Sequence, residues 1–348
     1  MTGRAGQFRE DLDYYIEFKA RAEGVCLQRE EINFEEFLGS LDIEHYLGLR
    51  GSETWSEDGN ESQVIIKILI GQILTEHLPS ADAIPSLYLR FAEKLQPWDR
   101  VITFNYDILL ERACEQVGKP YRLAPMRYTS TSNGSEIDSS SDNEVAILKM
   151  HGSIDWFNRK HYRIRQESAR DIGYPDYVPE DPIFNSQRNL RTVPLVSGAR
   201  SDDDPLREVH RVIDIERLYA SPPFLRATPT LITPSTSKVV YTQQLGEYWH
   251  GKAYEGAHRF RMVIIGYSLP PHDDYARQVI YRLVTNYQDI PAERVRCDSR
   301  QQKEPIIFVD LCETPTRQNE VRERYRFIDW SKAQAFFDGF NQDVIAAL

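Results

Sequence analysis

The sequence lacks the patterns that mark membrane and secreted proteins. Its longest apolar stretch, residues 64–74, is interrupted by Lys67 and Gln72 and is far shorter than the roughly 20 residues that span a bilayer. The first residues show no basic segment followed by an apolar one, so no signal peptide is expected. We therefore expect a soluble, cytoplasmic chain that makes no membrane contacts.

Basic charge is also scarce. Lys and Arg total 42 against 53 Asp and Glu, which gives a net charge of -11, and no dense basic run occurs. Proteins that bind nucleic acids neutralise the phosphate backbone with clustered Lys and Arg. Direct nucleic-acid binding is therefore not expected.

Cysteines are few and far apart. The four are Cys26, Cys114, Cys297 and Cys312, and no two form the C-x-x-C pairs that structural zinc sites use. A cytoplasmic chain also has little use for disulfides. We expect no zinc or other metal, and we interpret all four cysteines as small buried apolar residues.

What the chain does contain is enough apolar sequence for a large core, because 41% of its 348 residues are hydrophobic. Helical spacing of apolar residues over residues 1–98 predicts an N-terminal helical segment, with a polar connector at 51–60. From residue 99 onward, short apolar strands alternate with amphipathic helices. The strands are expected near 99–104, 145–150, 230–232, 261–266 and 305–310, and helices near 107–117, 241–254, 273–286 and from about 330.

This alternation is typical of an α/β fold: a Rossmann-like, mostly parallel sheet with helices on both faces. Residues 129–143 are almost wholly polar and predict a surface loop, and residues 158–229 predict a proline-rich insertion with one helix near 209–219. We interpret residues 1–98 as the helical part and residues 99–348 as the sheet region of one composite domain.

Unusual polar residues follow four of the predicted strands. They are Asn105 and Asp107, then His151, then Gly266 and Ser268, and finally Asp310. Ligands of α/β folds bind outside the carboxyl ends of the strands, so these residues predict a binding site at one rim of the sheet.

Each of these residues also has a purely structural interpretation. Asp107 suits the N-cap of the following helix, and Asn105 suits a turn. His151 could be a buried core histidine, and the segment from Gly266 to Ser268 a strand-to-helix turn. Their coincidence at one rim favours the functional interpretation.

Three segments resemble motifs of the sirtuins and, more fully, of the bacterial SIR2-like family. They are Thr103-Phe-Asn-Tyr-Asp107, Leu-Lys-Met-His-Gly-Ser-Ile-Asp-Trp at 148–156, and Ile-Gly-Tyr-Ser-Leu-Pro at 265–270, in the family's order. Members of the family bind NAD across a Rossmann-like sheet and cleave the bond between nicotinamide and ribose. Many are effectors of bacterial anti-phage defence.

The resemblance implies a role for each matching residue. Asn105 would hold the water or the nicotinamide-side ribose, and His151 would act as general base, a task that suits an imidazole near neutral pH. The implied NAD-binding residues are Thr103, Phe104, Asp107, Gly266, Tyr267, Ser268 and Asp310. The implied partners are NAD, further copies of the chain, and a HerA-like ATPase or another defence protein.

Two family features are missing from the sequence. The close cysteine pairs of the sirtuin zinc module are absent, which favours NAD hydrolysis over protein deacylation. The Gly-Ala-Gly-x-Ser phosphate loop has no counterpart, because Gly3-Arg-Ala-Gly6 follows no apolar strand. We expect either a start codon assigned too late or a lost phosphate cradle. A weakly catalytic NAD-binding, ADP-ribose-binding or structural subunit and an NAD-dependent deacylase stay open as alternatives.

Overall fold

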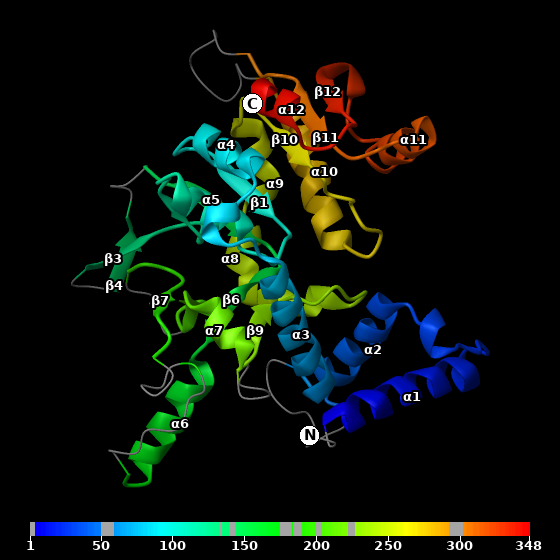
Figure 1. The fold of residues 1–348 in the computed structure, drawn as a ribbon, viewed down its shortest axis with the longest axis vertical. Coiled ribbons are helices and arrows are strands. Elements are labelled where there is room, and N and C mark those ends of the chain that lie inside the picture. The colour runs from blue at the N-terminus through cyan, green and yellow to red at the C-terminus, as the bar shows by residue number, and fades with distance from the viewer. Residues whose placement is uncertain are drawn as a thin grey trace. The chain divides into compact units, whose positions relative to one another are not determined.

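The computed structural model describes residues 4–49, 59–131, 134–138, 143–174, 183, 189–198, 204–221, 227–291 and 302–348. The chain divides into two compact units, which we call unit 1 (Met1–Ile84 and Leu95–Tyr248) and unit 2 (Pro85–Lys94 and Trp249–Leu348). Both combine helices with parallel strands, so the α/β class is confirmed (Figure 1). Among the described residues, no helix has the length and apolar character needed to cross a membrane.

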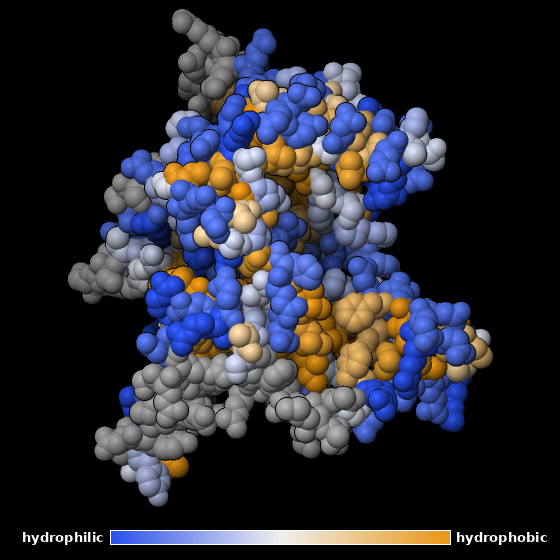
Figure 2. Space-filling model, viewed as in Figure 1, coloured by the Kyte–Doolittle hydropathy of each residue, from blue (hydrophilic) through white to orange (hydrophobic). Residues whose placement is uncertain are grey.

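Unit 1 begins with the expected helices α1 (Arg4–Ala22), α2 (Phe34–Tyr46) and α3 (Glu61–His77). The Asn33 side chain caps α2, and Asn60 caps α3. A cluster of Tyr15, Phe37 and Ile66 joins the three helices. Some apolar side chains around α2 and α3 remain on the surface, as the orange areas of Figure 2 show. Residues 50–58 of the predicted connector lie outside the described residues.

Unit 1 contains a three-stranded parallel sheet. Its order is β1 (Arg100–Thr103), β5 (Val145–Lys149) and β2 (Tyr121–Arg122), so β5 lies in the centre and all five of its residues are buried. The helix α5 (Leu109–Gln116) follows β1, as the sequence predicts. Thr103 pairs with Lys149, which brings the carboxyl ends of β1 and β5 to one edge.

A second sheet of unit 1 is antiparallel. Its order is β7 (Thr192–Pro194), β8 (Val209–Val212), β6 (Gly152–Asn158) and β9 (Pro229–Leu231). The helix predicted near 209–219 is therefore wrong in its first half: β8 is a strand, and α7 (Ile215–Ala220) follows it. Pairing of β8 with β6 decides the conformation here, and a local apolar pattern cannot reveal such pairing. The helix α6 (Lys160–Asp171) follows β6 in the chain and belongs to unit 1.

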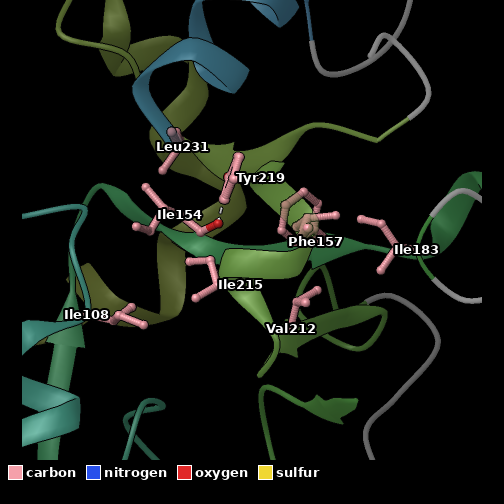
Figure 3. Close-up of a cluster of buried hydrophobic side chains, with 9 residues drawn as sticks. Ile108, Ile154, Phe157, Ile183, Val212, Ile215, Tyr219 and Leu231 are labelled. Carbon is pink, nitrogen blue, oxygen red and sulfur yellow. Dashed lines mark hydrogen bonds between the residues drawn. The ribbon is translucent and has the colours of Figure 1, made fainter. Parts of the chain in front are cut away.

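The core of unit 1 lies beside β6. Ile154 and Phe157 of this strand pack with Val212 and Leu231 from its two neighbours, and the Tyr219 hydroxyl donates to the Ile154 carbonyl at 2.8 Å (Figure 3). The helix α3 contacts the same sheet at β6 and β9. This packing fixes the strand that begins directly after His151.

The polar segment 129–143 is not simply a loop. Its described part forms a hairpin of β3 (Tyr128–Thr131) and β4 (Gly134–Ile137). Backbone hydrogen bonds hold such a ladder, so a polar composition does not prevent it. Residues 132–133 and 139–142 of the predicted loop lie outside the described residues.

Unit 2 contains the other parallel sheet, in the order β10 (Val263–Ile265), β11 (Ile306–Val309) and β12 (Ala333–Phe336). The strand β11 is buried on both faces. Ile306 and Phe308 join one apolar cluster with α10 (Asp274–Asp289) and α11 (Pro315–Arg324), whereas Ile307 and Val309 join another with α12 (Gln342–Ala347). The helix α4 (Ser86–Lys94) also packs on α12.

Three sequence predictions need correction here. The parallel strands do not form one sheet in the described residues, because β1 and β5 pair in unit 1 while β10 and β11 pair in unit 2. The terminal helix expected from about residue 330 is replaced by a short 3-10 turn at Trp330–Lys332, the strand β12 and then α12. The helix expected at 241–254 is split into a 3-10 stretch (Lys238–Leu245), α8 (Gly246–Trp249) and α9 (Lys252–Glu255).

Candidate functional site

Asn105 and His151 lie at the same edge of the parallel sheet of unit 1. Each comes two residues after the paired positions Thr103 and Lys149. His151 is 5% exposed, and its ring meets the Phe104 ring edge-on, with 5.0 Å between the centroids. The Asn105 side chain is exposed to solvent, which leaves its amide accessible to a ligand. The structure thus brings together the two residues predicted to be catalytic.

Backbone hydrogen bonds tie the segment that carries Asn105 to the segment that carries His151. The Thr103 carbonyl accepts from the Met150 amide at 2.9 Å, and the Tyr106 carbonyl accepts from the Ile154 amide at 3.1 Å. The Asn105 amide N–H also donates to the Thr103 hydroxyl oxygen at 3.2 Å. The two segments therefore form one braced unit, as preorganised sites require.

The glycine after His151 is required by its surroundings. Gly152 has φ +79°, and a Cβ at this position would lie 1.9 Å from the Thr230 carbonyl oxygen. The strand β9 approaches so closely because it pairs with the start of β6, and the Ile232 amide donates to the His151 carbonyl at 2.9 Å. Only glycine fits a left-handed conformation against another backbone.

Asp107 has a structural role in this edge. One of its carboxylate oxygens accepts a hydrogen bond from the Leu109 amide at 2.9 Å, at the start of α5. The N-cap position of α5 is Ile108, so the predicted N-cap role of Asp107 is wrong by one residue, and its carboxylate instead supports the turn that leads into the helix. Its carbonyl oxygen accepts from the Lys149 ammonium.

Sequence reasoning missed Lys149, Glu111 and Tyr106. Lys149 and Glu111 form an ion pair of 2.9 Å, and their side chains are 1% and 3% exposed. Burial raises the pKa of Glu111, and the Lys149 charge opposes that rise. The Tyr106 ring lies 6.3 Å from the His151 ring, and its hydroxyl donates to the Ile232 carbonyl at 2.5 Å. A lysine within the apolar run Ile-Leu-Lys-Met was the signal available for this ion pair.

In unit 2, Gly266 and Asp310 lie at one edge of the second parallel sheet. They directly follow Ile265 and Val309, which are paired, and the Gly266 amide donates to the Val309 carbonyl at 2.8 Å. Gly266 has φ +60° and is exposed, with open space where a Cβ would be. An Asp310 carboxylate oxygen accepts from the Leu311 amide at 2.7 Å.

The turn after Gly266 is held by side chains. The Tyr325 hydroxyl donates to the Tyr267 carbonyl at 2.6 Å, and the Arg324 guanidinium donates to the Ser268 carbonyl at 2.8 Å. The next residue, Leu269, is fully buried at φ +51°, an unusual conformation for a side chain of this size. These contacts hold the strained turn in place.

The structure therefore distributes the predicted residues between two units. Unit 1 brings together Thr103, Phe104, Asn105, Asp107 and His151, and unit 2 brings together Gly266, Tyr267, Ser268 and Asp310. The expectation that all of them share the rim of one sheet is wrong, because the strands that carry them pair in separate sheets.

No group of three or more His, Cys, Asp or Glu that could hold a metal ion occurs among the described residues. Cys114 and Cys312 are buried free thiols, and burial raises the pKa of Cys114 to about 12. Cys26 is exposed, so its interpretation as a buried residue is wrong. Cys297 lies outside the described residues.

The family comparison concerns the part of the chain from β1 to α7. Residues 99–219 match the model of the SIR2-like domain. The match confirms the resemblance and includes Asn105 and His151, whereas Gly266 and Asp310 lie outside it. It supports an NAD-related, sirtuin-like function at the level of the family. No curated protein matches the chain.

Proposed function

We propose that the protein hydrolyses NAD to nicotinamide and ADP-ribose at Asn105 and His151. The observation that carries the proposal is that the exposed Asn105 and the buried His151 lie at the same sheet edge, inside the segment that matches the SIR2-like domain. Hydrolysis of a glycosidic bond to a good leaving group uses one group that orients the attacking water and one that accepts its proton. An amide and an imidazole suit these two tasks.

The chemistry balances without a strong acid. The oxygen of water attacks the anomeric carbon of the ribose, and the bond to nicotinamide breaks with its electron pair moving to the pyridinium nitrogen. Nicotinamide thus leaves as a neutral molecule. In the proposed reaction His151 accepts the proton of the attacking water, and the Asn105 amide orients that water or a ribose hydroxyl.

The remaining predicted residues are proposed to contact NAD from within their own unit. In this proposal Thr103, Phe104 and Asp107 contact the nicotinamide side. Gly266, Tyr267, Ser268 and Asp310 contact the phosphates or the adenosine. The exposure of Gly266 and Ser268 supports contacts with a ligand through the backbone of that turn.

The biological proposal is that the protein is a cytoplasmic effector of anti-phage defence, which acts as a homo-oligomer or with a HerA-like ATPase or another defence partner. Its test is cellular NAD during phage infection of bacteria that express the wild-type chain or the Asn105→Ala variant. We expect NAD to fall only with the wild type. An equal fall with both chains would contradict the proposal.

The enzymatic test is incubation of the purified protein with NAD and measurement of free nicotinamide. We expect release without any peptide present. Release only after addition of an acetylated peptide would indicate a deacylase. NAD binding measured by calorimetry without release would indicate the binding subunit, and neither binding nor release would refute both proposals.

A further inference from the structure

Lys149 is an unusual residue for its position. It lies on the central strand of the parallel sheet of unit 1, and its side chain is 1% exposed. Burying an ammonium group is costly unless it is paired and hydrogen-bonded. Here the group donates to the Asp107 carbonyl, which lies in the segment between β1 and α5, and to the Glu111 carboxylate, which lies in the first turn of α5.

These contacts link the two proposed catalytic residues. Asp107 lies two residues after Asn105, and Lys149 lies two residues before His151. The Thr103 and Tyr106 carbonyls are held by backbone amides, and the Asp107 carbonyl is held by the Lys149 ammonium. The lysine thereby braces the end of the Asn105 segment that lies next to α5.

A role in stability alone does not explain this arrangement. Replacing a buried ion pair with apolar side chains of similar volume is often neutral or stabilising, because desolvation offsets the attraction between the charges. A second ion pair, between the partly buried Arg211 and the buried Asp155 at 2.8 Å, also contributes to the electrostatic environment of Glu111. Apolar side chains at positions 149 and 111 should therefore change the stability of the fold little, but they should displace Asn105.

We infer that Lys149 is a positioning residue, whose hydrogen bond to the Asp107 carbonyl fixes Asn105 relative to His151. Its effect on turnover rests on the proposed NAD hydrolysis. Its effect on the segment itself does not. Loss of this hydrogen bond should lower kcat, because a small displacement of a catalytic group slows the reaction. It should leave KM nearly unchanged.

The decisive variant is Lys149→Met combined with Glu111→Met. It removes the hydrogen bond to Asp107 and leaves no unpaired buried charge at either position. We expect an unfolding midpoint within about 5 °C of wild type. We expect kcat for NAD cleavage to fall by between about tenfold and a hundredfold, with KM within about threefold.

Two further proteins serve as comparisons. Glu111→Gln removes the carboxylate but keeps Lys149 beside the Asp107 carbonyl, so kcat per folded molecule should stay within about threefold. Lys252→Met combined with Glu255→Met removes another ion pair with a buried lysine, of 2.7 Å, and controls for the general effect of such a replacement.

A readout without catalysis is hydrogen exchange of the peptide that covers residues 104–110. In the Lys149→Met/Glu111→Met variant we expect exchange at least about tenfold faster in this peptide, with α3 unchanged. Unchanged exchange there, unchanged kcat, or an equal loss of kcat in Glu111→Gln would overturn the inference. Faster exchange in a protein whose wild type does not cleave NAD would support the brace and refute the proposed function instead.

Discussion

The two parallel sheets of the protein hold their strand-end segments in different ways. In unit 1, amide groups of β6 and of the β5–β6 turn, together with the buried Lys149, hold the carbonyls of Thr103, Tyr106 and Asp107 on either side of Asn105. In unit 2, the side chains of Tyr325 and Arg324 hold the carbonyls of the turn after Gly266. One edge is thus braced mainly by the backbone of a neighbouring sheet, and the other mainly by side chains of α11 and the residue after it.

The difference matches what each edge offers to a ligand. Unit 1 presents side chains that can orient water and accept a proton, and such groups need fixed positions. Unit 2 presents an exposed turn at Gly266, whose backbone lies in the left-handed region and offers main-chain groups.

The comparison is tested most strongly by placing alanine at the glycine of each edge. In Gly152→Ala the alanine must adopt a left-handed φ, and its Cβ would clash with the Thr230 carbonyl oxygen. We therefore expect unit 1 to lose more than about 3 kcal/mol of unfolding free energy. In Gly266→Ala the alanine has open space for its Cβ and only the left-handed φ is unfavourable, so we expect a loss of about 1 kcal/mol in unfolding free energy. Urea denaturation of both variants measures the two values, and equal losses would contradict the account.

The side-chain brace of unit 2 is tested by Tyr325→Phe. The variant removes the hydroxyl that donates to the Tyr267 carbonyl and keeps the ring, which is 1% exposed. We expect a loss of about 1 kcal/mol in unfolding free energy. Tyr281→Phe is the matched control, since that side chain is 49% exposed, and its effect should be close to zero. A loss as small as that of the control would show that the hydroxyl contributes nothing to the brace.

A smaller effect on stability is expected from the buried carboxylate of Asp42, which has neutral hydrogen-bond donors. Glu111 faces a lysine, whereas the Asp42 carboxylate accepts from the Gln63 amide at 2.6 Å and from the Ser235 hydroxyl. Burial raises the pKa of Asp42, so its folded state binds a proton more readily than its unfolded state. The stability linked to this protonation is present at low pH and is lost as pH rises through the raised pKa.

We therefore expect the unfolding free energy of wild type to rise relative to Asp42→Asn as pH falls from neutrality towards 3.8, the ordinary pKa of an aspartate. The asparagine does not titrate, and the difference should be on the order of 1 kcal/mol or less. Thermal melts of both proteins across this pH range measure it. A difference of the opposite sign would contradict the assigned direction of the pKa shift.

Much of the local structure could be predicted from the sequence. The apolar runs at β1, β5, β10 and β11 and the helices after β1 and β10 are strong local patterns, and the polar residues behind them were found for that reason. The position of Asn105 and His151 at the same sheet edge followed from the parallel strands that precede them, in which Thr103 pairs with Lys149.

The remainder depends on contacts between distant segments. Ala333–Phe336 has little strand character of its own and becomes β12 by pairing with β11. The division into two parallel sheets is likewise a matter of which strands pair. Lys149 was visible as a charged residue in an apolar run, but its partners Asp107 and Glu111 lie across the fold and could not be named from their positions in the sequence.

The most direct test of the central claim is the kcat for nicotinamide release from NAD by wild type, Asn105→Ala and His151→Ala, each shown to be folded by thermal melting. We predict turnover by the wild type and a loss of at least about a hundredfold in each variant, the usual effect of removing a general base or an orienting group. Turnover by either variant at the wild-type rate would contradict the account.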